Sequence, residues 1–182
     1  MSVIAVYSDG TRCCMACDSQ ASNGGAKAIM KGSKIVERNG WLFGAEGSPV
    51  AQQAIEYDLS PASLLEHDPL AHWAAVDFYP WLYSKLKSRG QLVPVSGRDE
   101  LPGQILIARK SEFVLLDTIG AVVEFATDFW AIGSGGAEAR GAMYARELDN
   151  GHSDQIVSEA VAAACALDDG CSKPIHFEWS KP

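Results

Sequence analysis

Apolar and polar positions alternate in short runs at the start of the chain. Residues 3–7 (VIAVY) form an apolar run, residues 8–11 (SDGT) have the composition of a turn, and residues 12–16 (RCCMA) read as extended again. This pattern predicts a β-hairpin. In its register, residue i pairs with roughly residue 19 minus i, so that Asp18 lies at the strand end that carries Ser2.

A second hairpin is predicted around the Asn-Gly pair at positions 39 and 40, which separates the extended runs 34–38 (KIVER) and 41–43 (WLF). Asn-Gly between two such runs is the strongest short-range hairpin signal. The open end of this hairpin carries Lys34 on one strand and residues 45–48 (AEGS) on the other. Both predicted hairpins therefore present polar side chains where their strands end.

Helical and extended segments are grouped in the rest of the sequence. Ser48-Pro49 is typical of a helix N-terminus. The predicted helices cover residues 49–58, 69–89 with a bend or break at Pro80, 137–148 and 155–167, and the predicted strands cover 104–108, 113–117, 122–125, 129–132 and 174–179. Grouped strands and grouped helices favour an α+β fold in which two packed sheets each carry a helix pair on the outer face.

Length and composition narrow the class of protein. A chain of 182 residues with 47% hydrophobic and 21% charged residues is expected to form one globular domain, residues 1–182. A net charge of −8 argues against nucleic acid or an anionic membrane as the main partner. The longest purely apolar run, residues 160–167, is too short to span a bilayer. The N-terminal residues lack the pattern of a secretory signal, which predicts a cytoplasmic location.

The five cysteines do not suggest a disulfide framework, because their number is odd. Cys14 and Cys17 have the spacing of a zinc-binding pair, but side chains three apart on a strand point to opposite faces, and no second pair follows. Buried thiols that act as small hydrophobic side chains are the favoured interpretation. No metal and no cofactor is expected.

Four short motifs occur in order along the chain: residues 17–21 (CDSQA), 31–35 (KGSKI), 43–47 (FGAEG) and 131–136 (AIGSGG). Together with the order of elements, they resemble the proteasome β-subunit and HslV-type peptidase family, and most of all the small proteasome-like proteins of bacteria and phages. The resemblance covers nearly the whole chain. The spacing of Ser2, Asp18 and Lys34 is that of the family's nucleophile, carboxylate and lysine.

The resemblance implies an N-terminal nucleophile hydrolase with a four-layer αββα sandwich that cleaves peptide (amide) bonds. Ser2 is then the nucleophile, and its α-amine, freed by removal of Met1, is the general base. Lys34 is expected beside Ser2, and Asp18 beside Lys34. The resemblance further implies a homo-oligomeric ring, a peptide or protein substrate and a possible unfoldase ATPase partner.

The same resemblance assigns the remaining site residues. The backbone N–H of Gly47 is expected to form the oxyanion hole, and three polar residues are expected to orient the amine: Ser134, Asp169 and Ser172. By position, Ala21, Ala45 and Pro49 line the first specificity pocket, which suggests a small or apolar substrate side chain there. Glu46 is a departure, because the family usually has a small residue beside the oxyanion donor.

Elementary chemistry supports these residue types independently. A serine hydroxyl needs an adjacent base to act as a nucleophile at neutral pH. An α-amine titrates at about 7.7–8.0 in model peptides, so it can be neutral and accept the hydroxyl proton. A lysine cation beside the amine lowers the pKa of the amine by like-charge repulsion, and Asp18 would keep Lys34 charged and in place.

Other interpretations of these residues remain open. Asp18 and Lys34 would also fit an ordinary surface ion pair, and the glycines would fit turns with positive φ. Two alternatives to a peptidase are the hydrolysis of a smaller amide and a catalytically silent member that only builds an oligomeric shell. A nucleotide-binding loop at residues 133–136 is disfavoured, because the third spaced glycine is Glu138 and no βαβ unit surrounds it. A Ser-His-Asp hydrolase is disfavoured too, because no G-x-S-x-G motif occurs.

The predicted helix over residues 69–89 is unusually rich in aromatic side chains. Five of them lie within eleven residues: Trp73, Phe78, Tyr79, Trp81 and Tyr83. This is more aromatic surface than one helix face normally buries in a monomer of this size. Some of these side chains are therefore expected at a contact between subunits.

Overall fold

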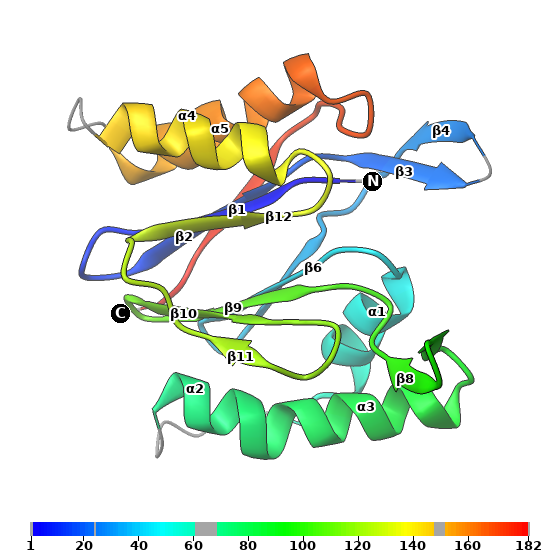
Figure 1. The fold of residues 1–182 in the computed structure, drawn as a ribbon. Coiled ribbons are helices and arrows are strands. Elements are labelled where there is room, and N and C mark those ends of the chain that lie inside the picture. Colours follow the sequence, from blue (N-terminus) through cyan, green and yellow to red (C-terminus); the bar gives the residue numbers. More distant parts are fainter. Residues whose placement is uncertain (1, 24, 61–68, 148–151, 182) are drawn as a thin grey trace.

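The chain folds into four layers, helices on sheet on sheet on helices, as Figure 1 shows. This computed structural model describes residues 2–23, 25–60, 69–147 and 152–181. Helices α4 (Gly136–Glu147) and α5 (Ser153–Leu167) cover one outer face. Helix α1 (Pro49–Asp58) and the segment from α2 (Leu70–Trp73) to α3 (Tyr79–Ser88) cover the other. The predicted α+β class and αββα sandwich are confirmed. The assignment of residues 1–182 to a single domain stays a prediction.

The first sheet has the strand order β12-β1-β2-β13, and all of its neighbouring strands are antiparallel. Its strands are β1 (Ile4–Ser8), β2 (Cys13–Cys17), β12 (Phe129–Ile132) and β13 (His176–Trp179). β1 and β2 are the predicted first hairpin. They lie in the middle of the sheet, with β12 beside β1 and the C-terminal strand β13 beside β2. The N-terminal strand therefore begins inside a sheet and not at its edge.

The second sheet has the order β11-β10-β9-β6-β5 and is also antiparallel. Its strands are β5 (Ile35–Arg38), β6 (Trp41–Ala45), β9 (Ile105–Arg109), β10 (Glu112–Leu116) and β11 (Val122–Val123). Asn39 and Gly40 join β5 to β6 with φ values of 52° and 86°. Both values are positive, as a type I′ turn requires. The second predicted hairpin is thus present, in the other sheet.

The register of the first hairpin differs from the prediction. Ile4 pairs with Cys17 and Ser8 with Cys13, so Asp18 follows directly after the strand and lies opposite Val3, not Ser2. The cause is the loop, which has four residues and is closed by a hydrogen bond from the Asp9 N–H to the Arg12 carbonyl. The Asp9 carboxylate also accepts the N–H groups of Thr11 and Arg12, which fixes this longer turn.

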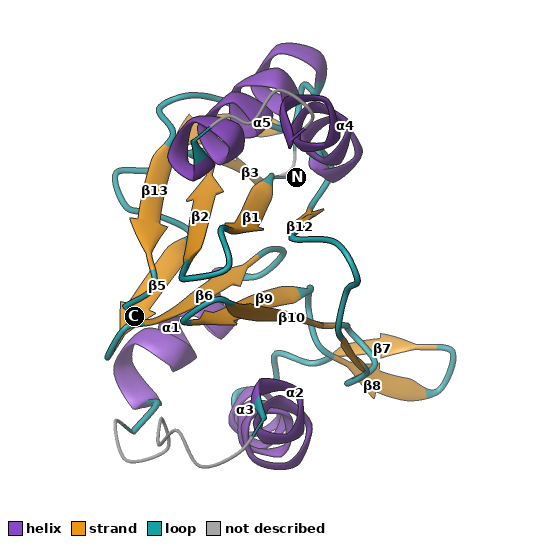
Figure 2. Cartoon of the chain, turned by 90° about the vertical axis from the view of Figure 1, so that its left-hand side faces the viewer, coloured by secondary structure: helices purple, strands orange, loops and turns teal. Residues whose placement is uncertain are grey.

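Two small hairpins were not predicted. β3 (Gln20–Asn23) pairs with β4 (Ala26–Ile29), and β7 (Val93–Val95) pairs with β8 (Arg98–Glu100). Figure 2 shows β7 and β8 projecting from the body of the molecule. β3 and β4 consist largely of small or polar residues, and β7 (Val-Pro-Val) contains a proline, so neither hairpin shows the apolar alternation that marks a strand in the sequence. β3 and β4 matter for the site, because they form one of its walls.

The helix predicted over residues 69–89 is continuous but locally widened. It begins as α2 (Leu70–Trp73), passes through a π-helical turn (Ala74–Phe78) and ends as α3 (Tyr79–Ser88). Pro80 has no N–H and its ring collides with the preceding turn, which explains why the widening stands immediately before it. At the predicted bend or break, the helix instead continues through Pro80 and contains a π-helical turn just before it.

The aromatic side chains of this helix mostly serve the internal core. Trp73 and Phe78 are buried, with relative exposures of 5% and 1%, and pack on Trp41 and Phe43 of β6. Tyr79, Trp81 and Tyr83 are half-buried against the same cluster. Of the five aromatic side chains of this helix, only these three have exposed surface for a contact between subunits. The exposed aromatic surface is therefore smaller than the sequence suggested.

A third apolar cluster fills the space between the two sheets. Residues of β1 and β2 that face inward, such as Ile4 and Met15, meet Leu42 of β6 and Leu106 of β9. Gly44 lies where the sheets come closest, because a Cβ atom there would stand 2.6 Å from the Cγ2 of Ile4. The inward face of β6 therefore carries Leu42 and Gly44, and the same alternation continued past the end of the strand leads to Glu46.

The cysteines behave as the hydrophobic interpretation predicts. Cys13, Cys14, Cys17 and Cys171 are buried, Cys165 is half-buried, and all five are free thiols. Burial raises the pKa of Cys13 and Cys14 to about 12. Within the described ranges no group of histidine, cysteine and acidic side chains is arranged to hold a metal ion.

Among the described helices, none combines the length and the apolar character that crossing a bilayer requires. The cytoplasmic location stays a prediction.

Candidate active site

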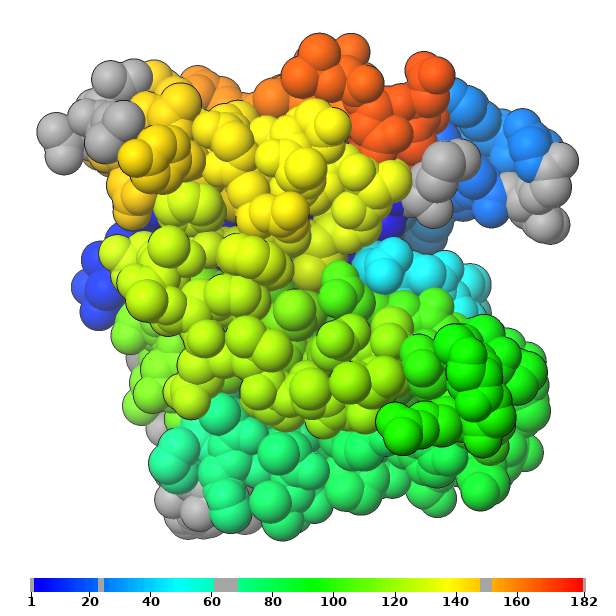
Figure 3. Space-filling view, viewed as in Figure 1, coloured from blue at the N-terminus to red at the C-terminus, as the bar shows by residue number. Residues whose placement is uncertain are grey.

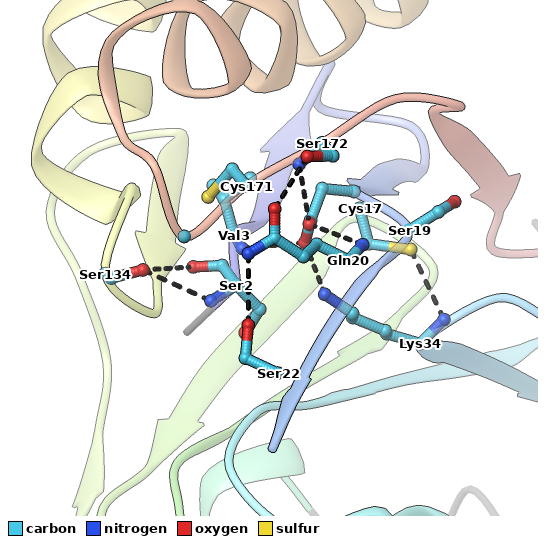
Figure 4. A network of polar contacts seen from close by, with 12 residues as sticks. Ser2, Val3, Cys17, Ser19, Gln20, Ser22, Lys34, Ser134, Cys171 and Ser172 are labelled. Carbon is cyan, nitrogen blue, oxygen red and sulfur yellow. Dashed lines mark hydrogen bonds and ion pairs between the residues drawn. The ribbon is translucent and has the colours of Figure 1, made fainter. Parts of the chain in front are cut away.

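Ser2 is held in place by the loop between β12 and α4. The carbonyl oxygen of Ser2 accepts hydrogen bonds from the Gly135 N–H at 3.2 Å and from the Ser134 hydroxyl at 3.4 Å. The nitrogen of Ser2 donates to the same hydroxyl at 3.2 Å. Figure 4 shows Ser134 facing Ser2 in this arrangement. Ser2 is only 3% exposed, so its backbone is fixed on both sides of the Cα atom.

The glycines of this loop are explained by how closely it approaches Ser2. Gly133 has a φ of 89°, and a Cβ atom there would lie 2.2 Å from the Ser2 carbonyl oxygen. At Gly135 a Cβ atom would lie 2.8 Å from both the Cβ of Ala164 and the Sγ of Cys171. Glycine is required where the backbone adopts positive φ or meets a neighbour at contact distance. Gly133 and Gly135 are thus explained by the contact of this loop with Ser2, just before β1, and a phosphate-binding role is not needed to explain them.

Asp18 is fully buried, and its carboxylate accepts hydrogen bonds from three backbone N–H groups and from the side chain of Lys34. Its Oδ1 accepts the Val3 N–H at 3.0 Å and the Lys34 Nζ at 2.5 Å. Its Oδ2 accepts the backbone N–H groups of Gln20 at 2.9 Å and Ser172 at 3.1 Å. One carboxylate therefore joins the start of β1, the start of β3, the lysine and the loop after α5.

Lys34 and Asp18 form a buried ion pair and not a surface pair. The side chain of Lys34 is 8% exposed and that of Asp18 is 0% exposed. Surface pairs contribute at most about 1 kcal/mol, but breaking a buried pair by removing one partner costs about 3–5 kcal/mol. The surface interpretation left open by the sequence is therefore excluded. Through Asp18, Lys34 is linked to the backbone N–H of Val3, the residue after Ser2.

The loop after α5 contributes differently from the expectation. Ser134 makes a hydrogen bond with Asp168, and this bond lowers the pKa of the Asp168 carboxyl more than any other interaction does; the Gly170 N–H and the Cys171 thiol lower it further. Asp169, which the resemblance selected, takes part through its backbone carbonyl, which accepts Lys27 Nζ at 2.6 Å. In this structure the carboxylate that reaches Ser134 is thus Asp168.

Gln20 is a site residue that sequence reasoning did not select. Its side-chain amide donates to the Ser22 hydroxyl at 3.0 Å and to the Asp169 carbonyl at 3.1 Å, and its oxygen accepts the Ser172 hydroxyl at 2.6 Å. Gln20 is 1% exposed. It ties the loop after α5 to β3, and its only signal in the sequence was its place two residues after Asp18.

A pocket of about 480 Å³ opens in front of Ser2. The structure brings the predicted Ser2, Lys34 and Gly47 together around it. The three predicted specificity residues, Ala21, Ala45 and Pro49, also line it. Figure 3 shows the surface hollowed between the blue β3–β4 hairpin and the cyan segment that follows β6. Ser134, Asp168 and Ser172 lie behind Ser2 and Asp18, outside the pocket wall.

Gly47 is held by close backbone packing. It has a φ of 85°, and a Cβ atom there would lie 2.2 Å from the Pro102 carbonyl oxygen. The preceding residue, Glu46, pairs with Gln104: its N–H donates to the Gln104 carbonyl at 3.1 Å, and its Oε1 accepts the Gln104 N–H at 3.2 Å. The backbone that carries the predicted oxyanion donor thus packs closely against residues 102–104, and the Glu46 carboxylate accepts a hydrogen bond at one of its two oxygens.

Comparison with known proteins gives matches in structure but not in sequence. No family model matches this sequence, and no curated protein matches it. The structure of Thiobacillus denitrificans BPH in complex with epoxomicin is similar with a TM-score of 0.78 and 23% identity, over 99% of this chain and 100% of that chain. A second structure of Thiobacillus denitrificans BPH is similar with a TM-score of 0.78 and 24% identity, over 100% of this chain and 98% of that chain.

Eukaryotic HslV from Trypanosoma brucei is similar with a TM-score of 0.69 and 19% identity, over 97% of this chain and 98% of that chain. The similarity extends over nearly the full length of each protein. At this identity it shows the fold, which is that of the proteasome-like N-terminal nucleophile hydrolases.

Proposed function

We propose that this chain is an N-terminal nucleophile hydrolase that cleaves peptide bonds, with Ser2 as the nucleophile. The observation that supports this most directly is the buried Lys34–Asp18 pair, which lies at the strand end that holds Ser2 and opens onto the pocket. Burying a charge pair costs desolvation free energy. Such pairs occur preferentially at functional sites, where they shift the pKa of a neighbouring group.

The reaction follows from the groups around Ser2. Removal of Met1, a residue outside the described part of the chain, frees the amine of Ser2. The neutral amine accepts the Oγ proton as Oγ attacks the substrate carbonyl carbon, and the Gly47 N–H donates to the resulting oxyanion. The amine then gives the proton to the leaving nitrogen, the C–N bond breaks, and an acyl-enzyme ester remains. Water hydrolyses the ester with the same amine as the base.

The residues behind Ser2 keep the amine in position. The Ser134 hydroxyl accepts the Ser2 N–H, and its one proton is directed either to the Ser2 carbonyl or to the Asp168 carboxylate. Lys34 lowers the pKa of the amine by like-charge repulsion, so that more of it is neutral at working pH. The proposal therefore assigns the orienting carboxylate to Asp168 and keeps Ser172 as a partner of Asp18.

Epoxomicin provides the test, because a structure of the similar BPH is described as a complex with it. We expect intact mass spectrometry to show one covalent epoxomicin per chain on protein that lacks Met1. A matched preparation that retains residues before Ser2, for example behind an uncleaved tag, is expected to form no adduct, because its Ser2 nitrogen is an amide. A chain without Met1 that forms no adduct at saturating inhibitor would favour the silent-shell interpretation.

A ring of identical subunits is the assembly we propose. The resemblance implies it, and the half-buried Tyr79, Trp81 and Tyr83 leave aromatic surface on the outer helix. Light scattering at micromolar concentration is expected to give a multiple of the chain mass of 19.5 kDa. A monomeric mass would contradict the ring. The unfoldase ATPase partner stays a prediction of the resemblance.

A further inference from the structure

We infer that the pocket beside Ser2 selects a basic side chain, lysine or arginine, through the carboxylate of Glu46. The inference rests on the proposed function, because it names the substrate residue for the same site. It differs from the expectation of a small or apolar substrate side chain, which considered Ala21, Ala45 and Pro49 but not the charge beside them.

Glu46 faces the same space as Ser2. On β6 the side chain of Leu42 and the Cα of Gly44 point between the sheets, and the pairing of β6 with β9 continues through the hydrogen bond from Glu46 to Gln104. Alternation along the strand therefore places Glu46 on that inner face. On β1 the inner face carries Ile4 and, two residues earlier, Ser2. Both residues line the pocket where the two sheets end.

The charge of Glu46 is not matched by the protein. Lys34 and Glu46 are the two acidic or basic side chains of the pocket wall, and Lys34 already has a partner in Asp18 at 2.5 Å. The Glu46 carboxylate accepts one backbone N–H, from Gln104, and no cationic side chain of the described chain pairs with it. This hydrogen bond orients the carboxylate and leaves its second oxygen for a ligand.

Gln52 adds a second acceptor. It lines the same pocket, and its amide NH₂ donates to the Ser33 carbonyl at 2.7 Å. Its side-chain oxygen makes no hydrogen bond within the described ranges. An ammonium or guanidinium group has donors only, so a carboxylate oxygen and an amide oxygen are matching partners.

The rest of the wall suits the aliphatic part of a basic side chain. It consists mainly of small or apolar residues: Ala21, Ala26, Ala28, Met30, Ala45 and Pro49. Lysine and arginine bury their methylene groups along such surface while the charged end meets a polar partner. A short apolar side chain would leave much of the 480 Å³ unfilled and would leave the Glu46 carboxylate without a cation.

The test measures binding in a Ser2→Ala background, so that it does not depend on turnover. Two fluorescent peptides that differ only in the residue before the bond to be cleaved, arginine or leucine, are titrated at low salt. We expect the arginine peptide to bind at least about tenfold more tightly. Glu46→Gln is expected to bring this ratio close to one, and high salt is expected to reduce it. Glu56→Gln, which removes a carboxylate of α1 outside the pocket wall, is the matched control and keeps the ratio.

Each outcome decides the inference. A leucine peptide that binds as tightly as the arginine peptide, or an arginine preference that survives Glu46→Gln, overturns it. The same comparison is made for turnover by the unaltered chain, with lysine, arginine, leucine and aspartate before the scissile bond. Adduct formation or turnover without a basic preference would refute only the specificity. A basic preference in binding, with neither an adduct nor turnover of the lysine and arginine peptides, would refute only the peptidase.

Discussion

Ser2→Ala abolishes covalent adduct formation and lowers peptide hydrolysis by at least about 10⁴-fold, if Ser2 is the nucleophile. Alanine keeps the free amine, the strand and every backbone contact of residue 2, including the hydrogen bond from Gly135. Only the Oγ atom is lost. The free energy of unfolding should therefore change by less than about 1 kcal/mol, and a folded, inactive protein is the expected result. Intact mass, fluorogenic peptide turnover and urea unfolding measure the three quantities.

Ser2→Thr is the matched control for this change. It restores the hydroxyl with one added methyl group, so part of the activity is expected to return. Activity of both the serine and the threonine form should rise with pH as the amine loses its proton, with an apparent pKa at or below the value of about 7.7–8.0 of a free α-amine. An adduct on Ser2→Ala, or full activity of protein that retains Met1, would refute the N-terminal nucleophile.

Lys34→Ala is expected to reduce turnover nearly to background and to destabilise the fold. The catalytic loss follows because the cation that lowers the pKa of the amine is gone. The loss of stability follows because Asp18, which is 0% exposed, loses its cationic partner, at a cost of about 3–5 kcal/mol. Any residual activity should shift to higher pH, since the amine then holds its proton longer. A pH–rate profile and urea unfolding measure both effects.

A double variant separates the two effects. Lys34→Met with Asp18→Asn removes both charges, so it is expected to recover part of the stability lost in the single variant but none of the activity. Asp18→Asn alone should lower activity less than Lys34→Ala does. Lys27→Ala is the control for a lysine near the site, because Lys27 is exposed and contacts only a backbone carbonyl. Normal peptidase activity in Lys34→Ala would remove the lysine from the mechanism.

The apolar pattern was sufficient for the two sheets and their helices, because these elements bury a regular face. The register of the first hairpin could not be obtained in this way. Asp9 caps Thr11 and Arg12 and closes a four-residue loop, whereas the Asp-Gly pair by itself is equally compatible with a two-residue turn. β3 and β4 were missed for a different reason: β4 is exposed throughout, and the buried Gln20 of β3 makes polar contacts and does not pack in an apolar core.

The site was predictable where it depended on sequence spacing and unpredictable where it depended on side-chain direction. The resemblance, through the spacing of Ser2, Asp18 and Lys34, predicted that these residues lie close together; Asp18 pairs with Lys34, and Ser2 and Lys34 line one pocket. In the run DDGCS, either aspartate fits a turn, and only the folded loop shows that Asp168 reaches Ser134. The role of Gln20 could not be inferred, because its three partners come from β3 and from a loop about 150 residues away.

The peptide unit between Ser2 and Val3 is fastened at both of its polar atoms, the Ser2 carbonyl by Gly135 and the Val3 N–H by Asp18. Chain ends normally fray, and ordering one residue costs about 1–2 kcal/mol of conformational entropy. Here that cost is met once, when the protein folds, and not again in each catalytic cycle. The nucleophile is thus ordered before any substrate arrives, and loss of Met1 removes a residue without releasing the one behind it.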